Sequence, residues 1–137
     1  MMKQVVFSSF LVLMLGQAAQ AQQNTADPVF LAKTKVMVKE IFKDCPTYYG
    51  DEYVAQYAVT LSRFTIGTQP VMPAENFPLL SSVPLVGNKC NPALSRDQTF
   101  DPVTFNPLKY FFDYRSTGVK KYRVDNTNYI ISIAPQP

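Results

Sequence analysis

The side chains in this sequence that could take part in chemistry are two cysteines, ten acidic residues and eight tyrosines, and there is no histidine. Without histidine the chain cannot build a Ser-His-Asp or Cys-His catalytic arrangement or a histidine-ligated zinc site. It also lacks the commonest general base near neutral pH. The few glycines are isolated and form no phosphate-binding loop. Carboxylates could still do acid and base work.

Two carboxylates can act as acid and base, as in glycoside hydrolysis. The candidates are Asp51, Glu52, Asp97, Asp101, Asp113 and Asp125. Their spacing selects no pair, and helix starts, turns and solvated strand positions explain them as well. The oxygens of residues 125–128 could hold calcium, but this segment is too short and too weakly charged for an EF-hand, so we expect a hairpin turn. We assign no catalytic residue, no metal site and no cofactor.

The two cysteines, Cys45 and Cys90, are predicted to form one disulfide bond, because an exported chain matures where oxidised pairs persist. They lack the C-x-x-C spacing of redox-active dithiols, and a zinc site would need more sulfur or nitrogen ligands. The alternative is two buried thiols.

Three tyrosines, Tyr49, Tyr53 and Tyr57, follow one another at intervals of four and would form a stripe on a helix. Tyrosine provides a large, stiff contact area that ends in a hydroxyl group, so such stripes can bind protein or sugar. The alternative is that they cover the edge of the core.

These residues belong to a chain with an export signal. Residues 5–15 form an apolar run that follows Lys3. This run is too short to span a bilayer, and it fits the core of a secretory leader. Ala19-Gln20-Ala21 matches the A-x-A cleavage pattern, so we predict a signal peptide over 1–21 and a single exported domain over 22–137, without a membrane span. Removal of Lys3 with the leader lowers the net charge of +3 by one. The remaining positive charge is too weak to indicate a nucleic-acid partner.

Two helices are predicted first. Asp27 and Pro28 are suited to a helix start, and apolar residues at helical spacing predict a helix over 28–43, with a strand as the rival interpretation. Asp51 and Glu52 open a second helix over 51–62, and an alternating pattern predicts a strand over 63–69.

The rest of the chain is predicted as a proline-rich connection followed by strands. Residues 70–107 hold seven of the eleven prolines, so we expect an extended, packed segment there. Strands over 108–114, 119–124 and 129–134 would form an antiparallel meander. Leu108, Tyr110, Phe112 and Tyr114 would share one face, as would Tyr129, Ile131 and Ile133, and both rows would meet the helices. The predicted class is α+β, with two N-terminal helices packed on an antiparallel sheet of three or four strands.

The C-terminal half carries FNPLKY at 105–110 and YRVDNTNYII at 122–131, and ENFPLLSSV at 75–83 and NKCNP at 88–92 precede them. With these segments the chain resembles small exported proteins of the Bacteroidota that have no assigned activity. The resemblance implies an envelope location in a Gram-negative bacterium and transfers no functional residue.

The leading hypothesis is a non-enzymatic envelope module, periplasmic or extracellular, that binds a protein or polysaccharide partner through aromatic surface. One alternative is a hydrolase that uses carboxylates on envelope glycan or peptide. Another is a small-ligand carrier with a dry pocket lined by Phe111, Tyr122 and Ile131.

Overall fold

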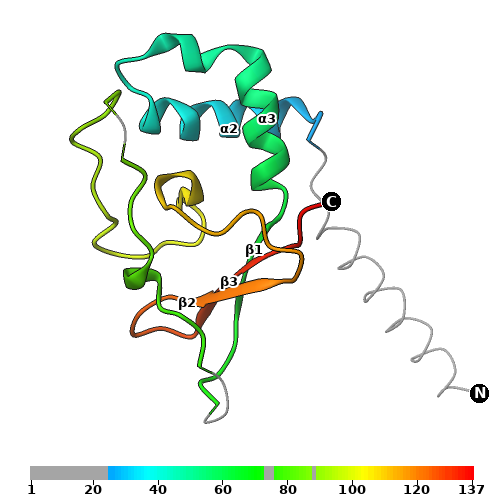
Figure 1. The fold of residues 1–137 in the computed structure, drawn as a ribbon, viewed down its shortest axis with the longest axis vertical. Helices are drawn as coiled ribbons and strands as arrows, with labels where there is room; N and C mark the ends of the chain where they lie inside the picture. The colour runs from blue at the N-terminus through cyan, green and yellow to red at the C-terminus, as the bar shows by residue number, and fades with distance from the viewer. Residues whose placement is uncertain (1–24, 73–75, 88) are drawn as a thin grey trace, which may run out of the picture.

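The computed structural model describes residues 25–72, 76–87 and 89–137. They form helices α2 (Pro28–Ile41) and α3 (Asp51–Leu61), short 3-10 helices η1 (Pro46–Tyr49), η2 (Leu80–Ser82) and η3 (Pro107–Lys109), and strands β1 (Phe64–Thr68), β2 (Lys120–Arg123) and β3 (Tyr129–Ile133). Figure 1 shows α2 and α3 together at one end of the molecule and the sheet at the other. The predicted α+β class is confirmed, whereas the leader predicted over 1–21 lies outside the described residues.

Helix α2 begins where its local signals place it. The Asp27 carboxylate accepts a hydrogen bond from the Val29 amide at 3.0 Å, and Pro28 stands where a missing amide hydrogen costs nothing. The buried face of the helix carries Thr34, Val38 and Ile41. The helix prediction is confirmed to within two residues at its end, and the rival strand is wrong.

Helix α3 packs against α2 and forms a small core with it. Its buried residues are Val54, Ala58 and Leu61, and the two acids predicted to open it, Asp51 and Glu52, lie in its first turn. One hydrophobic cluster joins the two helices through Val38, Ile41, Leu61 and Leu108. Leu108 belongs to η3, so the chain beyond the helices completes their core.

The sheet has the order β1-β3-β2, and both pairings are antiparallel. β1 pairs with β3 from Phe64 opposite Ile133 to Thr68 opposite Tyr129. The strand predicted over 63–69 thus takes one edge of the sheet, and the predicted strands over 119–124 and 129–134 form the hairpin beside it. The turn between them contains Asn126 at φ 59°, as expected for an Asx-rich connection.

The predicted meander is wrong, because residues 108–114 contain the end of η3 and one isolated bridge at Tyr110 and form no sheet strand. The amides of Val86 and Phe111 donate to the carbonyls of Lys109 and Pro84, both at 2.8 Å, so the segment pairs with the proline-rich connection. A single bridge, Leu85 to Tyr110, results. Pro84 has no amide hydrogen, which stops the ladder from growing.

Residues 105–114 form a layer between the helices and the sheet, which we call the middle layer. This segment is the gold to orange part of the chain in Figure 1. Phe105, Tyr110 and Phe112 belong to the sheet core together with Ile131 and Ile133. Among the described residues this cluster takes none from α2 or α3. Tyr129, Ile131 and Ile133 of β3 therefore share a face as predicted, but this face packs against residues 105–114 and not against the helices. Leu108 turns the other way, toward the helices.

The proline-rich connection is packed, as predicted. Leu80 and Val83 are buried in the sheet core, and the Arg123 amide donates to the Pro78 carbonyl at 2.9 Å along the edge of β2. The disulfide between Cys45 and Cys90 is present, with the two Cα atoms 5.3 Å apart. It ties the connection to the end of the helical layer.

Candidate binding surface

The structure separates the three tyrosines of the predicted stripe. Tyr53 and Tyr57 lie on α3, and Tyr53 is 37% exposed, whereas Tyr49 ends η1. The Tyr49 hydroxyl donates to the Lys43 carbonyl, and its half-buried ring packs against the helix core with the Lys39 ammonium 5.7 Å from its centre. Tyr49 therefore supports the corner between the helices, and Tyr53 is the most accessible of the three.

Tyr48, which the sequence pattern did not single out, completes an aromatic corner. Its ring stacks on Phe42 with centroids 4.6 Å apart and meets Tyr53 edge-on at 5.4 Å. Tyr57 also contacts Phe42, with the ring centroids 5.9 Å apart and the rings tilted. We call Phe42, Tyr48, Tyr53 and Tyr57 the aromatic corner. Tyr48 and Tyr53 are each 37% exposed, so the corner presents two partly exposed tyrosines to solvent.

The disulfide fixes the aromatic corner to the rest of the molecule. Cys45 caps η1, and the Tyr48 amide donates to its carbonyl at 3.1 Å. Beside the disulfide, the Asp44 amide donates to the Cys90 carbonyl at 2.9 Å, and the Asn91 side chain donates to the Glu40 carbonyl at 2.6 Å. These bonds hold the turn that carries Tyr48, so the aromatic corner is preorganised for binding.

An apolar hollow of about 290 Å³ continues the aromatic corner toward the middle layer. It is lined by Ile41, Phe42, Tyr57, Thr60, Val86, Leu108, Phe111 and Tyr114. Phe111 is 68% exposed, an unusual position for a phenylalanine. Together the corner and the hollow form the aromatic surface. Burial raises the pKa of Tyr57, with the neighbouring Tyr48 and Tyr53 adding to the effect, so its hydroxyl stays protonated.

The oxygen atoms around the hollow are mostly used inside the protein. The Tyr114 hydroxyl donates to the Tyr110 carbonyl at 3.1 Å, and the Thr60 hydroxyl faces the Gln56 carbonyl at 3.5 Å. No hydrogen bond of the Tyr57 hydroxyl is found among the described residues. The hollow thus offers a ligand apolar contact and one phenolic hydroxyl.

Two of the candidate acids, Asp97 and Asp125, line a second hollow of about 440 Å³. Asp125 accepts hydrogen bonds from the Ser81 amide and hydroxyl at 3.0 and 2.5 Å. The Ser81 side chain is the main cause that lowers the pKa of Asp125, which is the opposite of what a general acid needs. Asp97 accepts from Lys109 at 2.9 Å and from the Tyr110 hydroxyl at 3.1 Å.

Of the other candidate acids, Asp51 and Glu52 lie in the first turn of α3, and Asp101 and Asp113 accept hydrogen bonds from nearby backbone amides. Asp101 accepts from the Val103 amide at 2.9 Å, and Asp113 accepts from the Arg115 amide at 3.2 Å. In the described residues no group of three or more acidic or cysteine side chains could hold a metal ion. Of the residues predicted to line a ligand pocket, Tyr122 and Ile131 are cross-strand partners in the sheet core, whereas Phe111 is 68% exposed and lines the apolar hollow instead.

Comparison of the chain with protein-family models, with curated proteins and with solved structures finds no significant match. Among the described residues, no helix has the length and apolar character needed to cross a membrane. The function therefore has to be inferred from the aromatic surface itself.

Proposed function

We propose that this protein is an exported, non-enzymatic binding module that captures an apolar side chain of a partner protein in the hollow of its aromatic surface. The observation that carries the proposal is Phe111, 68% exposed at an apolar hollow that Phe42 and Tyr57 join to the aromatic corner. Binding energy at protein interfaces concentrates where aromatic anchors fill desolvated pockets. A preformed hollow flanked by exposed rings matches that arrangement.

A protein partner fits the surface better than a polysaccharide. Sugar sites combine an aromatic face with several polar groups that bind hydroxyls, as small-molecule sites do in general. Here the Tyr114 and Thr60 hydroxyls face backbone carbonyls of their own chain. An apolar side chain of a partner protein has no hydroxyl group that needs a hydrogen-bond partner. Tyr48 and Tyr53 could cover the residues next to it in the partner.

Export supports a role in the envelope. The predicted leader over 1–21, the resemblance to exported Bacteroidota proteins and a disulfide compatible with an oxidising compartment all favour the periplasm or the cell surface. N-terminal sequencing of the protein from its native cells should begin at Gln22. Cys45 and Cys90 should resist alkylation until the protein is reduced.

Photo-crosslinking in those cells tests the proposed surface. A photoreactive residue at position 111 should give one dominant protein adduct, and the same residue at position 119 should not, although Val119 is 57% exposed. Phe111→Ser and Tyr53→Ala should then weaken binding of the identified partner at least tenfold without lowering the melting temperature, whereas Val119→Ser should not.

The outcome against the proposal is equally defined. If positions 111 and 119 give the same adducts, or if Phe111→Ser binds the identified partner like the wild type, the aromatic surface is not the docking site. If the wild-type protein is retarded in gels that contain envelope polysaccharide, and Tyr53→Ala is not, the partner is a polysaccharide and not a protein.

A carboxylate hydrolase is the second candidate, because Asp97 and Asp125 line one hollow. In that case the protein should cleave envelope glycan or peptide, and each of the single variants Asp97→Asn and Asp125→Asn should abolish the cleavage. The lowered pKa of Asp125 and the commitment of Asp97 to Lys109 favour the binding module over this candidate.

A further inference from the structure

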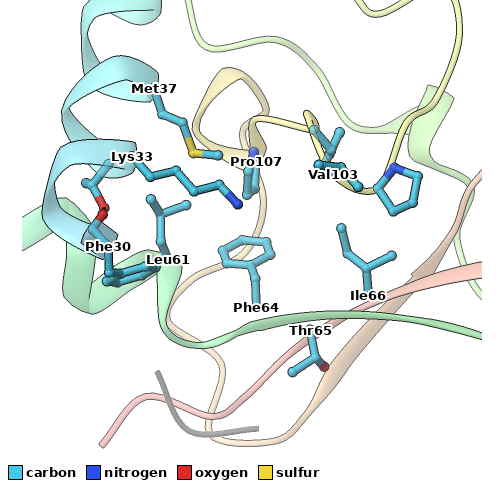
Figure 2. Close-up of a pocket in the computed structure, with 12 residues that line it drawn as sticks. Phe30, Lys33, Met37, Leu61, Phe64, Thr65, Ile66, Val103 and Pro107 are labelled. Atoms are coloured by element: carbon cyan, nitrogen blue, oxygen red, sulfur yellow. Dashed lines mark hydrogen bonds between the residues drawn. The ribbon is translucent and has the colours of Figure 1, made fainter. Parts of the chain in front are cut away.

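A separate hollow of about 400 Å³ lies between α2, β1 and the loop before η3, and shares no lining residue with the aromatic surface. Figure 2 shows α2 along one wall and the Phe64 and Ile66 side chains of β1 rising from its floor, whereas the Thr65 side chain points to the opposite side of the strand. Its lining is Phe30, Lys33, Thr34, Met37, Leu61, Phe64, Thr65, Ile66, Pro102, Val103, Phe105 and Pro107. Its volume falls in the range of roughly 300–1,000 Å³ that small-molecule sites occupy.

The lining is apolar along most of its length. Nine of the twelve residues carry hydrocarbon, aromatic, proline or thioether side chains. The Thr34 hydroxyl is buried and donates to the Phe30 carbonyl at 2.8 Å, so it is already used within α2. The apolar part runs from Phe30 and Leu61 at the helices to Ile66 and Val103 at the far end (Figure 2). A ligand here would be mainly hydrocarbon.

Lys33 is the exception and sets the charge of the site. Among the described residues that line the hollow it is the only charged one, and none of them is a carboxylate. In Figure 2 its side chain extends from α2 across the mouth of the hollow, with the ammonium directed toward Pro107 and Phe64. No ion pair or hydrogen bond of this ammonium is found in the described part of the chain. A cation at the edge of an apolar hollow, without a counter-ion, favours an anionic head group.

We propose that this hollow binds an amphipathic monocarboxylate with a linear hydrocarbon tail, whose head group pairs with Lys33 and whose tail lies along Phe64, Ile66 and Val103. A single cation matches a singly charged head group, and phosphate sites commonly recruit several donors. Burial of the methylene groups supplies most of the affinity. The ion pair fixes the orientation of the ligand.

Calorimetric titration with decanoate, below its micelle concentration, tests this site directly. Wild-type protein should show saturable binding, and Lys33→Gln should weaken it about tenfold, because a hydrogen bond between charged groups is lost. Lys35→Gln is the matched control, since Lys35 lies on the same helix but not in the lining. Decyltrimethylammonium, with the same tail and the opposite charge, should bind at least tenfold more weakly than decanoate.

Two further variants locate the ligand. Val103 is 73% exposed, so Val103→Asp should fold normally, and it should weaken decanoate binding because the hydrocarbon tail would have to desolvate the new carboxylate. Phe111→Ser, in the other hollow, should leave decanoate binding unchanged, which separates this site from the proposed partner site. The inference is overturned if wild-type protein shows no saturable binding, if Lys33→Gln and Lys35→Gln bind alike, or if Phe111→Ser abolishes the signal.

Discussion

The Lys109 ammonium lies 2.9 Å from the Asp97 carboxylate inside the middle layer, and the lysine side chain is only 6% exposed. Glu40 of α2 approaches the same ammonium at 3.6 Å, and the Tyr110 hydroxyl donates to the second Asp97 oxygen at 3.1 Å. Burial lowers the pKa of Lys109, but the hydrogen bond to Asp97 and the charges of Asp97 and Glu40 outweigh it and raise the pKa. Lys109 is therefore held as a cation that joins helix, loop and middle layer.

This network gives the FNPLKY segment a structural role. The Asn106 side chain accepts from the Leu108 amide at 3.1 Å and donates to the Met37 carbonyl and the Glu40 carboxylate, both at 3.0 Å. Leu108 completes the helix core, and Tyr110 is 1% exposed in the sheet core. The segment thus holds the helices and the sheet together.

Replacing Lys109 should reveal this role. Lys109→Ala should lower the free energy of unfolding by about 2–3 kcal/mol, because it leaves the network without its cation and opens a gap. Lys109→Met keeps the apolar stem, and both carboxylates retain access to water, so it should cost only about 1 kcal/mol. Urea unfolding measures both losses.

Lys120→Met is the control for charge alone. The Lys120 side chain is 47% exposed and its ammonium lies 4.0 Å from Asp113, so the change should stay below about 0.5 kcal/mol. A loss as large as that of Lys109→Ala would show that burial of Lys109 does not matter.

The elements with local signals were predictable from sequence. Asp27 and Pro28 determine the start of α2 through one side-chain hydrogen bond and one missing donor, and both act within a single turn. The Asx-rich turn places Asn126 in the left-handed region for the same local reason. The pairing of Cys45 with Cys90 followed from the predicted export and from the absence of any other cysteine.

The segment 110–114 shows where sequence is insufficient. Its burial alternates as in a strand, with Tyr110 and Phe112 buried and Phe111 exposed. Whether an extended segment joins a sheet depends on its partner, however, and here the partner is a distant segment whose Pro84 cannot donate.

The aromatic surface was only partly predictable. Helical spacing identified Tyr53 and Tyr57, but Tyr48 precedes α3, and its contacts arise from the η1 turn. The hollow gathers Thr60, Val86 and Phe111 from three segments far apart in the chain. No periodicity within one element could place these residues together.

Removal of the disulfide should cost about 2–4 kcal/mol, because the bond closes a loop between residues 45 positions apart and so restricts the unfolded chain. Cys45→Ser, Cys90→Ser and the double variant should show nearly the same loss in urea unfolding under non-reducing conditions. The reason is that each variant breaks the same bond. Additive losses in the double variant would contradict this, since they would mean that the two sulfurs contribute separately.

Asn126 should tolerate glycine but not valine. Its φ of 59° lies in the left-handed region, which glycine adopts freely and a β-branched residue avoids. Asn126→Gly should change the free energy of unfolding by less than about 0.5 kcal/mol, and Asn126→Val should lower it by about 1–2 kcal/mol. Asn128→Val is the control in the same turn; an equal loss there would indicate a general effect of valine.

Stability should fall at alkaline pH because of buried tyrosines. Burial is the main cause that raises the pKa values of Tyr110 and Tyr114 above their ordinary value of 10.0. In the unfolded chain these hydroxyls ionise near pH 10, whereas in the folded protein they remain protonated. Their contribution is therefore complete below about pH 10 and is lost as pH rises through the folded pKa.

Melting temperatures followed by circular dichroism between pH 8 and 12 should decline above pH 10. The decline should be shallower in Tyr114→Phe, which cannot ionise, and unchanged in Tyr53→Phe, whose ring is exposed. A decline equally steep in all three proteins would exclude Tyr114 as a source of the alkaline sensitivity.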